Sequence, residues 1–359
     1  MSWNISRVSS LQLNTANRSY VASATKLLQT AGQELSTGVK ADIFADLGAS
    51  AALDLTLRAR EANTQAYLTS NDILDSKLQA MLTSVDAARE SADSVLQTSI
   101  VNASRGTTGV SALNEEAEAA LESIIASLNI SFNGDYLFSG IDSDAQPLSR
   151  WDEIDTETGT SPAQLLSGIV GSGPATLAEA EDMIARFDAF FDSANADASE
   201  NFEGVFFNGT PAQAADGTPS ARVTARLDAD QSLEYGVQAN DQGFRDILKG
   251  LAMLAVVDVS TIEDDATYKA WMEAANTALG NGVEGALGAS ADIGFNQQVV
   301  ENASTRLGDL SLVQQTQIAA YENVDPYEAA TRVENLQYQL EASYTVTAKL
   351  SQMSLLNYL

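Results

Sequence analysis

Proline is distributed unevenly along this chain, and its distribution limits the fold more than any other feature. Five of the six prolines fall from Pro147 to Pro219, none comes earlier, and only Pro326 follows. Because proline interrupts helix interiors, the two long proline-free arms favour helices around an inserted middle. We therefore predict a mainly α protein: a long antiparallel helical bundle or coiled coil from both termini, with an inserted small α+β or mainly β domain.

Apolar residues in the first arm recur at alternating spacings of three and four, which indicates the seam of a helix packed on other helices. This stripe consists of Val21, Ala24, Leu28, Ala31 and Leu35. It stops before Gly38, a residue that suits a helix C-terminus. We expect a second helix from about 45 to 103, with its clearest seam at 74–95, and a third from about 111 to 130.

The middle of the chain shows weaker patterns. A tight turn at Asn133-Gly134 leads into a short extended segment, and one helix is expected over 177–191. Residues 222–227 alternate polar and apolar side chains, which predicts a half-buried strand, and 232–237 supply its partner.

Helices resume at about 244–257 and 266–279. A glycine-rich segment then predicts a joint before a return helix over about 292–321. The sequence Val324-Asp325-Pro326 should break that helix before the last one.

These patterns divide the chain into five expected parts. They are an N-terminal assembly helix (1–40), the N-terminal half of a helical rod (41–140), a variable surface-exposed insert (141–242), the C-terminal half of the rod (243–322) and a C-terminal assembly helix (323–359).

The two ends are the candidate functional surfaces, because each is an amphipathic helix with nothing else left in the chain to cover it. The last segment ends on apolar residues, as expected of a subunit whose packing is completed by a neighbour. The residues predicted to form this assembly interface are Val21, Ala24, Leu28, Ala31, Leu35, Leu336, Leu340, Leu350, Met353, Leu356 and Leu359.

Composition excludes several classes of function. The chain has no cysteine and no histidine, which removes disulfides, thiol catalysis, histidine bases and the commonest metal ligands. Its formal net charge of −30 disfavours nucleic acid and anionic lipid. The N-terminus lacks the apolar core of a cleaved secretory signal, so we expect either a cytoplasmic protein or export by another route.

Three possible sites are better explained without chemistry. Residues 280–285 match GxGxxG, with Glu301 at a suitable distance, but a helical segment precedes them instead of a strand. The acids Asp152, Glu153, Asp155 and Glu157 lack the spacing of a calcium loop. The pair Glu179 and Asp182 could support glycosidase chemistry, yet such pairs arise by chance in an acidic chain. We therefore predict no cofactor, no metal and no enzymatic activity.

Four segments resemble the flagellin superfamily. LSTGVKADIFADLGAS (35–50) is similar to the turn after the family's first helix, and ENVDPYEAA (322–330) to the break before its last. SFNGDYLFSG (131–140) and the ending LSQMSLLNYL resemble the hook-filament junction branch (hook-associated protein 3) more than typical flagellins. Leu35 and Pro326 depart from the family's usual residues.

The resemblance implies an extracellular structural subunit of the bacterial flagellum, exported through the flagellar type III apparatus without a cleaved signal. Its implied partners are copies of itself in a tubular axial structure, a neighbouring hook-associated protein, flagellin and an export chaperone. The implied role is to join hook to filament by intersubunit coiled-coil packing. The alternatives are flagellin itself, a carboxylate enzyme carried on the insert, and a secreted helical effector or adhesin.

Overall fold

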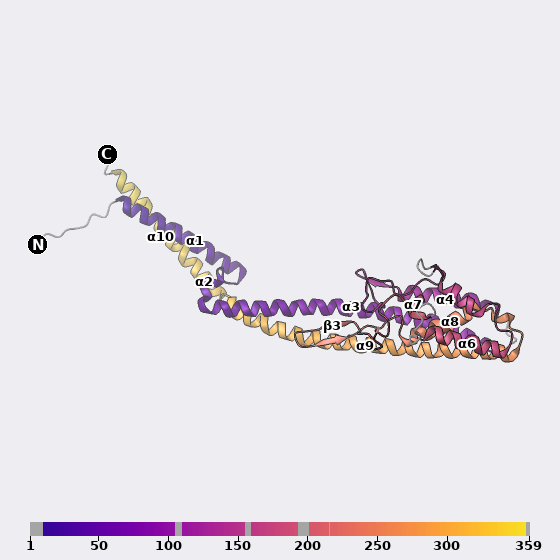
Figure 1. Ribbon diagram of the computed structural model, residues 1–359. Coiled ribbons are helices and arrows are strands. Elements are labelled where there is room, and N and C mark those ends of the chain that lie inside the picture. The colour runs from indigo at the N-terminus through magenta and orange to yellow at the C-terminus, as the bar shows by residue number, and fades with distance from the viewer. Residues whose placement is uncertain (1–9, 105–109, 155–158, 193–200, 215, 357–359) are drawn as a thin grey trace. The chain divides into compact units, whose positions relative to one another are not determined.

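The computed structural model describes residues 10–104, 110–154, 159–192, 201–214 and 216–356 (Figure 1). The chain divides into two compact units. Unit 1 comprises residues 1–65 and 308–359, and unit 2 comprises residues 66–307. The boundary falls within two long helices, so each unit is described by itself.

The described residues are mostly helical, which confirms the predicted fold class. The helices are α1 (Ser10–Thr37), α2 (Ile43–Leu47), η1 (Gly48–Ser50), α3 (Ala51–Asn102), η2 (Val110–Ala112), α4 (Leu113–Leu128), α5 (Pro162–Val170), α6 (Leu177–Phe191), α7 (Phe202–Val205), α8 (Gln242–Val256), η3 (Val259–Thr261), α9 (Asp265–Glu322) and α10 (Pro326–Leu356). The strands form two antiparallel hairpins, β1 (Ser131–Phe132) with β2 (Asp135–Tyr136), and β3 (Thr224–Arg226) with β4 (Ser232–Glu234).

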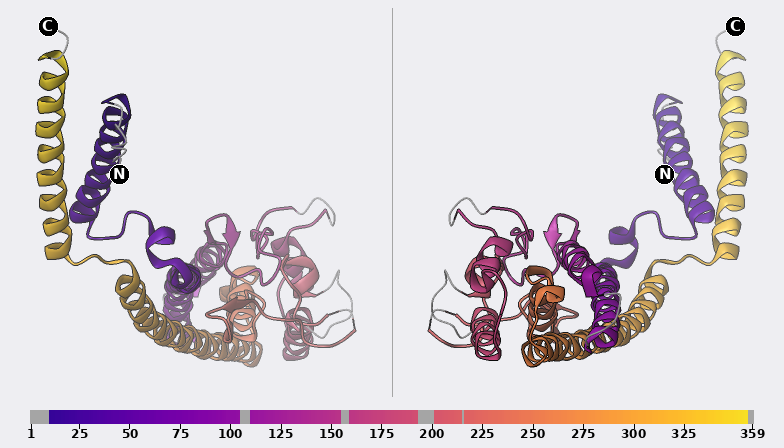
Figure 2. Two further views of the ribbon diagram at one scale, coloured as in Figure 1. Left: turned by 90° about the vertical axis from the view of Figure 1, so that its left-hand side faces the viewer. Right: turned by 90° about the vertical axis from the view of Figure 1, so that its right-hand side faces the viewer.

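In unit 1, α1 and α10 lie side by side (Figures 1 and 2). They are antiparallel, since Tyr20 near the start of α1 bonds Gln339, whereas Glu34 near its end bonds Arg332. The predicted helix ends are confirmed: α1 stops at Thr37, followed by Gly38 with a φ of +74°, and Pro326 begins α10. Glycine adopts that positive φ without the steric cost that a Cβ would impose.

The predicted second helix, 45–103, is wrong at its start. The chain forms the short helix α2 and a single 3-10 turn before α3 begins at Ala51. Asp42 caps α2 by accepting a hydrogen bond from Ala45 N, and Gly48 ends it at a φ of +52°. The apolar pattern did not reveal this interruption because both segments are helical and only the glycine marks the change of direction.

Unit 2 has one continuous hydrophobic core. Side chains from α3, α4, α8 and α9 share it with residues of the predicted insert. Phe187 of α6 meets Trp271 of α9 edge-to-face at 5.9 Å between ring centres, and the Trp271 indole donates to Met253 O of α8. The segment 141–242 therefore packs its apolar side chains on the long helices and does not enclose a separate core.

The glycine-rich joint predicted at 280–285 is wrong, because α9 runs through it without a break. These glycines are sites of close helix packing. A Cβ on Gly282 would lie 2.5 Å from Ile247 N, and one on Gly243 of α8 would lie 2.8 Å from the Gly285 carbonyl carbon. Both distances are shorter than any van der Waals contact, so α8 and α9 touch here through their backbones.

Within the insert, the predicted helix α6 and the predicted strand pair are confirmed. Ala225 pairs with Leu233 at the centre of the β3–β4 hairpin. Two helices were not expected. The first, α5, begins with a capping box in which Ser161 and Gln164 bond each other's backbone N–H groups. The second, α7, has only four residues, too few to produce a periodic pattern.

Candidate functional site

The candidate site is the terminal pair, the name used here for α1 and α10. Small and branched side chains form the seam between them. Ala24, Ala31, Leu336 and Leu340 are buried within the single chain, while Val21 and Leu28 are half-buried. Part of the predicted interface is therefore already covered inside one molecule, because each terminal helix covers the other's stripe.

The remaining predicted residues lie elsewhere. Leu35 is 40% exposed at the end of α1. Leu350, Met353 and Leu356 belong to α10 by their backbone, and Leu359 lies outside the described residues.

A second set of apolar side chains on the same two helices is open to solvent. This outer face consists of Tyr20, Leu27, Leu35, Tyr327, Tyr338, Tyr344 and Val346. Tyr338 is 71% exposed although it follows the buried Leu336 by only two residues, because consecutive helix positions are about 100° apart. The heptad stripe predicted from sequence omitted most of this face. The adjacent residues Leu27 and Leu28 could have indicated this face, since two consecutive leucines cannot both lie in one narrow seam.

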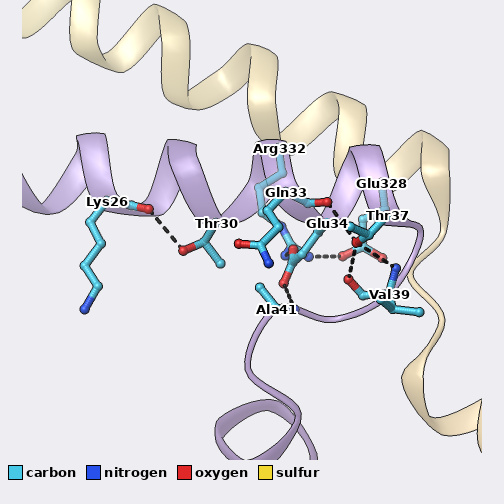
Figure 3. A network of polar contacts seen from close by, with 9 residues as sticks. All are labelled: Lys26, Thr30, Gln33, Glu34, Thr37, Val39, Ala41, Glu328 and Arg332. Carbon is cyan, nitrogen blue, oxygen red and sulfur yellow. Dashed lines mark hydrogen bonds and ion pairs between the residues drawn. The ribbon is translucent and has the colours of Figure 1, made fainter.

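A buried carboxylate fastens the terminal pair (Figure 3). Glu34 of α1 is 4% exposed, and its Oε2 accepts a hydrogen bond of 3.0 Å from Arg332 of α10. Its Oε1 accepts a second bond, of 3.3 Å, from the backbone N–H of Ala41. The Arg332 guanidinium also donates to the exposed Glu328 one turn earlier. One side chain thus connects α1, the segment that follows it and α10.

Unit 1 has two breaks between helices, one after α1 and one after α9, and the two breaks are hydrogen-bonded to each other. We call this region the joint, and it consists of residues 38–40, Asp54, Arg58 and residues 321–324. Lys40 N donates to Glu322 O at 2.8 Å, and Val324 N donates to Gly38 O at 2.9 Å. The Lys40 ammonium adds a bond of 2.7 Å to Tyr321 O. These bonds hold the segment that follows α1 against the end of α9 and the segment that follows it.

Two buried carboxyl groups lie beneath this pairing. Asp54 is 2% exposed in the first turn of α3, and Glu322 is buried at the end of α9. Both face Arg58 Nε, which donates to Glu322 and lies 3.5 Å from Asp54 Oδ2. Burial, followed by the negative charge of Glu322, raises the pKa of the Asp54 carboxyl above its ordinary value of 3.8.

Beyond the joint, polar side chains connect α3 to α9. Thr64 Oγ1 donates to Gln314 Oε1 at 3.1 Å, and both residues are buried. Glu61 accepts bonds from Gln315 and Ser311, and the Gln315 amide is the main cause that holds the pKa of Glu61 below its ordinary range. An interface built from matched amides and hydroxyls fixes register more strictly than apolar contacts alone.

The other sequence candidates that the structure describes do not assemble into a reactive site. Gly280, Gly282 and Gly285 lie inside α9 and not at its N-terminus, where a phosphate would bind. Glu179 accepts the backbone N–H groups of Ala175 and Thr176, which makes it a helix cap.

Among the residues with described positions, no group of three acids could hold a metal ion. The candidates Asp155 and Glu157 fall outside those positions. No helix in the described ranges is both long and apolar enough to cross a membrane.

Two family models match the two arms of the chain. Residues 8–143 match the bacterial flagellin N-terminal helical region, and residues 277–359 match the bacterial flagellin C-terminal helical region. A protein from Vibrio parahaemolyticus, provisionally assigned as a flagellar hook-associated protein, has a similar solved structure. It is 14% identical, with a TM-score of 0.52, and the match covers 77% of this chain and 99% of that chain. At that identity the likeness concerns the fold. No curated protein sequence matches.

Proposed function

This chain belongs to the bacterial flagellin family and is a flagellar structural subunit, and from that premise we propose that it joins the hook to the filament. In this role the terminal pair of each copy packs against the pairs of neighbouring copies in a tubular axial structure. The work of the protein is mechanical, and no step requires a cofactor, a metal or a catalytic group.

The observation that carries this proposal is the outer face of the terminal pair. Four tyrosines, two leucines and a valine are exposed there on two helices whose seam is already filled. Large exposed apolar side chains gathered on two paired helices are candidates for surfaces that a partner covers. Tyrosine is enriched at such interfaces because it buries a large ring and keeps a polar group for a hydrogen bond.

The distribution of charge supports the same assignment. Unit 1 has 8 basic and 11 acidic residues, which leaves 11 basic and 38 acidic residues for unit 2. Like charges on neighbouring copies repel, so a nearly neutral unit can pack closely whereas a strongly acidic one cannot. The difference favours assembly through unit 1 and solvent exposure of unit 2.

The junction role, as opposed to bulk flagellin, rests on two sequence elements. SFNGDYLFSG and the ending LSQMSLLNYL resemble junction proteins more than flagellins. We propose copies of itself, a neighbouring hook-associated protein, flagellin and an export chaperone as partners. We retain Leu350, Met353, Leu356 and Leu359 as proposed contacts between copies, together with Val21, Leu28 and Leu35.

Electron microscopy of a strain lacking this gene tests the proposal. A junction protein predicts intact hooks without filaments and flagellin monomers shed into the medium. If flagellin is this protein itself, the hooks are again bare, but the medium contains no flagellin at all. Flagella of normal length and number in the deletion strain would overturn both assignments.

Truncation gives a second test of the same surface. Removing residues 350–359 should leave the helicity and the unit 2 core intact, and should abolish incorporation into flagella. Restoration of motility by the truncated chain would show that the end of α10 is not a contact between copies.

A further inference from the structure

The joint buries two carboxyl groups that contact the same guanidinium. Asp54 and Glu322 are both buried, and they share one guanidinium nitrogen, Arg58 Nε. The second oxygen of Asp54, Oδ1, is buried and has no hydrogen-bond partner among the described residues. A buried carboxylate oxygen without a partner is costly, whereas a protonated carboxyl can donate there.

The other charged group near this pair is Lys40, from the segment after α1. Its ammonium already donates to the backbone oxygen of Tyr321. On the α10 side, the Arg332 guanidinium already donates hydrogen bonds to Glu34 and Glu328. The charged groups that act on Asp54 are therefore Glu322 from α9, Arg58 from α3 and Lys40 from the α1 exit. Of the basic residues with described positions, Arg58 alone contacts both carboxyl groups.

We propose that a proton on the buried Asp54 carboxyl locks the joint, and that loss of this proton releases the pairing between the end of α1 and the end of α9. With the proton bound, one carboxylate and one carboxylic acid face the Arg58 guanidinium. Without it, two carboxylates are buried side by side. Glu322 provides both a carboxylate for Arg58 and a backbone oxygen for Lys40 N, so repulsion at its side chain acts directly on the backbone pairing.

The sign follows from linkage. Burial and Glu322 raise the pKa of Asp54 in the folded chain above 3.8, so the folded state binds this proton more tightly than the unfolded state does. The stabilisation is fully present below the unfolded pKa and is lost as the pH rises through the folded pKa. The joint is therefore tighter at acidic pH than at alkaline pH.

Amide hydrogen exchange of the full-length chain tests this directly, because the Lys40 and Val324 amides form the two backbone bonds of the joint. Exchange is measured from pH 5 to pH 8 and divided by the intrinsic rate at each pH. We expect protection at both amides to fall at least tenfold over that range relative to amides of α4. Asp54→Asn, which cannot ionise, should remove this pH dependence.

Asp325→Asn is the matched control, since it removes an exposed carboxylate in the break between α9 and α10 and should behave as the unaltered chain does. Asp54→Asn could instead loosen the joint at every pH. Glu322→Gln is the second variant for that case. It removes the carboxylate beside Asp54, leaves Asp54 paired with Arg58, and should also abolish the pH dependence of protection. Equal protection at pH 5 and pH 8 in the unaltered chain overturns the proposal. So does a pH dependence that survives both substitutions.

Discussion

Arg332 of α10 donates a hydrogen bond of 3.0 Å to the buried carboxylate of Glu34 in α1, across 298 positions of sequence. The Arg332 side chain is 47% exposed, whereas that of Glu34 is 4% exposed, so water screens only one end of the pair. The second oxygen of Glu34 accepts the Ala41 N–H, which extends the connection to the segment after α1. This contact fixes how the two terminal helices are aligned along each other.

Replacing Arg332 by methionine keeps the length of the side chain and removes its charge. Glu34 then remains buried with only one backbone donor, and the local free energy of opening α1 from α10 should fall by about 1–3 kcal/mol. Hydrogen exchange of the α1 and α10 peptides measures this loss. Glu328→Gln is the control, since its exposed ion pair with Arg332 is worth little. An equal effect of the two substitutions would show that Glu34 needs no positive partner.

The close packing of α8 on α9 predicts opposite effects at two neighbouring glycines. Gly282→Ala places a methyl group 2.5 Å from Ile247 N and should lower the free energy of unfolding of unit 2 by about 1–3 kcal/mol. Gly280→Ala has nothing within 4 Å and should raise that free energy by about 0.5–1 kcal/mol through helix propensity. Urea unfolding followed by tryptophan fluorescence compares them. Equal shifts would contradict the backbone contact.

Two residues of α10 separate folding from assembly. Leu336→Ala removes a buried seam side chain and should weaken the α1–α10 pairing by about 2 kcal/mol. Tyr338→Ser changes an exposed side chain and should leave that pairing unaltered while reducing incorporation into flagella. Hydrogen exchange measures the strength of the α1–α10 pairing, and immunolabelling of isolated flagella measures incorporation. Normal incorporation of the Tyr338→Ser variant would remove that tyrosine from the proposed interface.

The turn of the β3–β4 hairpin should be sensitive to acid. The backbone N–H of Asp230, and next the guanidinium of Arg306, hold the pKa of Asp228 below its ordinary value of 3.8. The stability that Asp228 contributes is therefore present above pH 3.8 and is lost as the pH falls through the lower folded-state pKa. Asp228→Ala should lower hairpin protection by about 1 kcal/mol at neutral pH. Asp230→Ala, which replaces an exposed neighbouring side chain, should change hairpin protection far less.

Local signals predicted the end of α1, the start of α10 and the helix α6, but neither the start of α3 nor the continuity of α9. Gly38, Pro326 and the apolar period of α6 each act through the backbone or through one helix face, so they are readable without knowledge of partners. The helix α5 was also readable, through the Ser161–Gln164 capping box with Pro162 at the first helical position, although its short apolar pattern drew no prediction. The glycines of 280–285 led to the wrong prediction of a joint between two helices. Glycine favours a flexible break in an isolated segment, but in a packed helix it allows a close contact with the neighbouring helix.

The sequence by itself determined that long helices flank a proline-bearing middle, that α1 ends before Gly38 and α10 begins at Pro326, and that no cysteine or histidine chemistry is available. Only the tertiary structure decided which apolar residues of α1 and α10 are used within the chain and which stay exposed. It also brought Glu34 to Arg332 and Asp54 to Glu322. Helix periodicity is set by each segment's own backbone, whereas burial and charge pairing depend on residues hundreds of positions away, which a linear pattern does not encode.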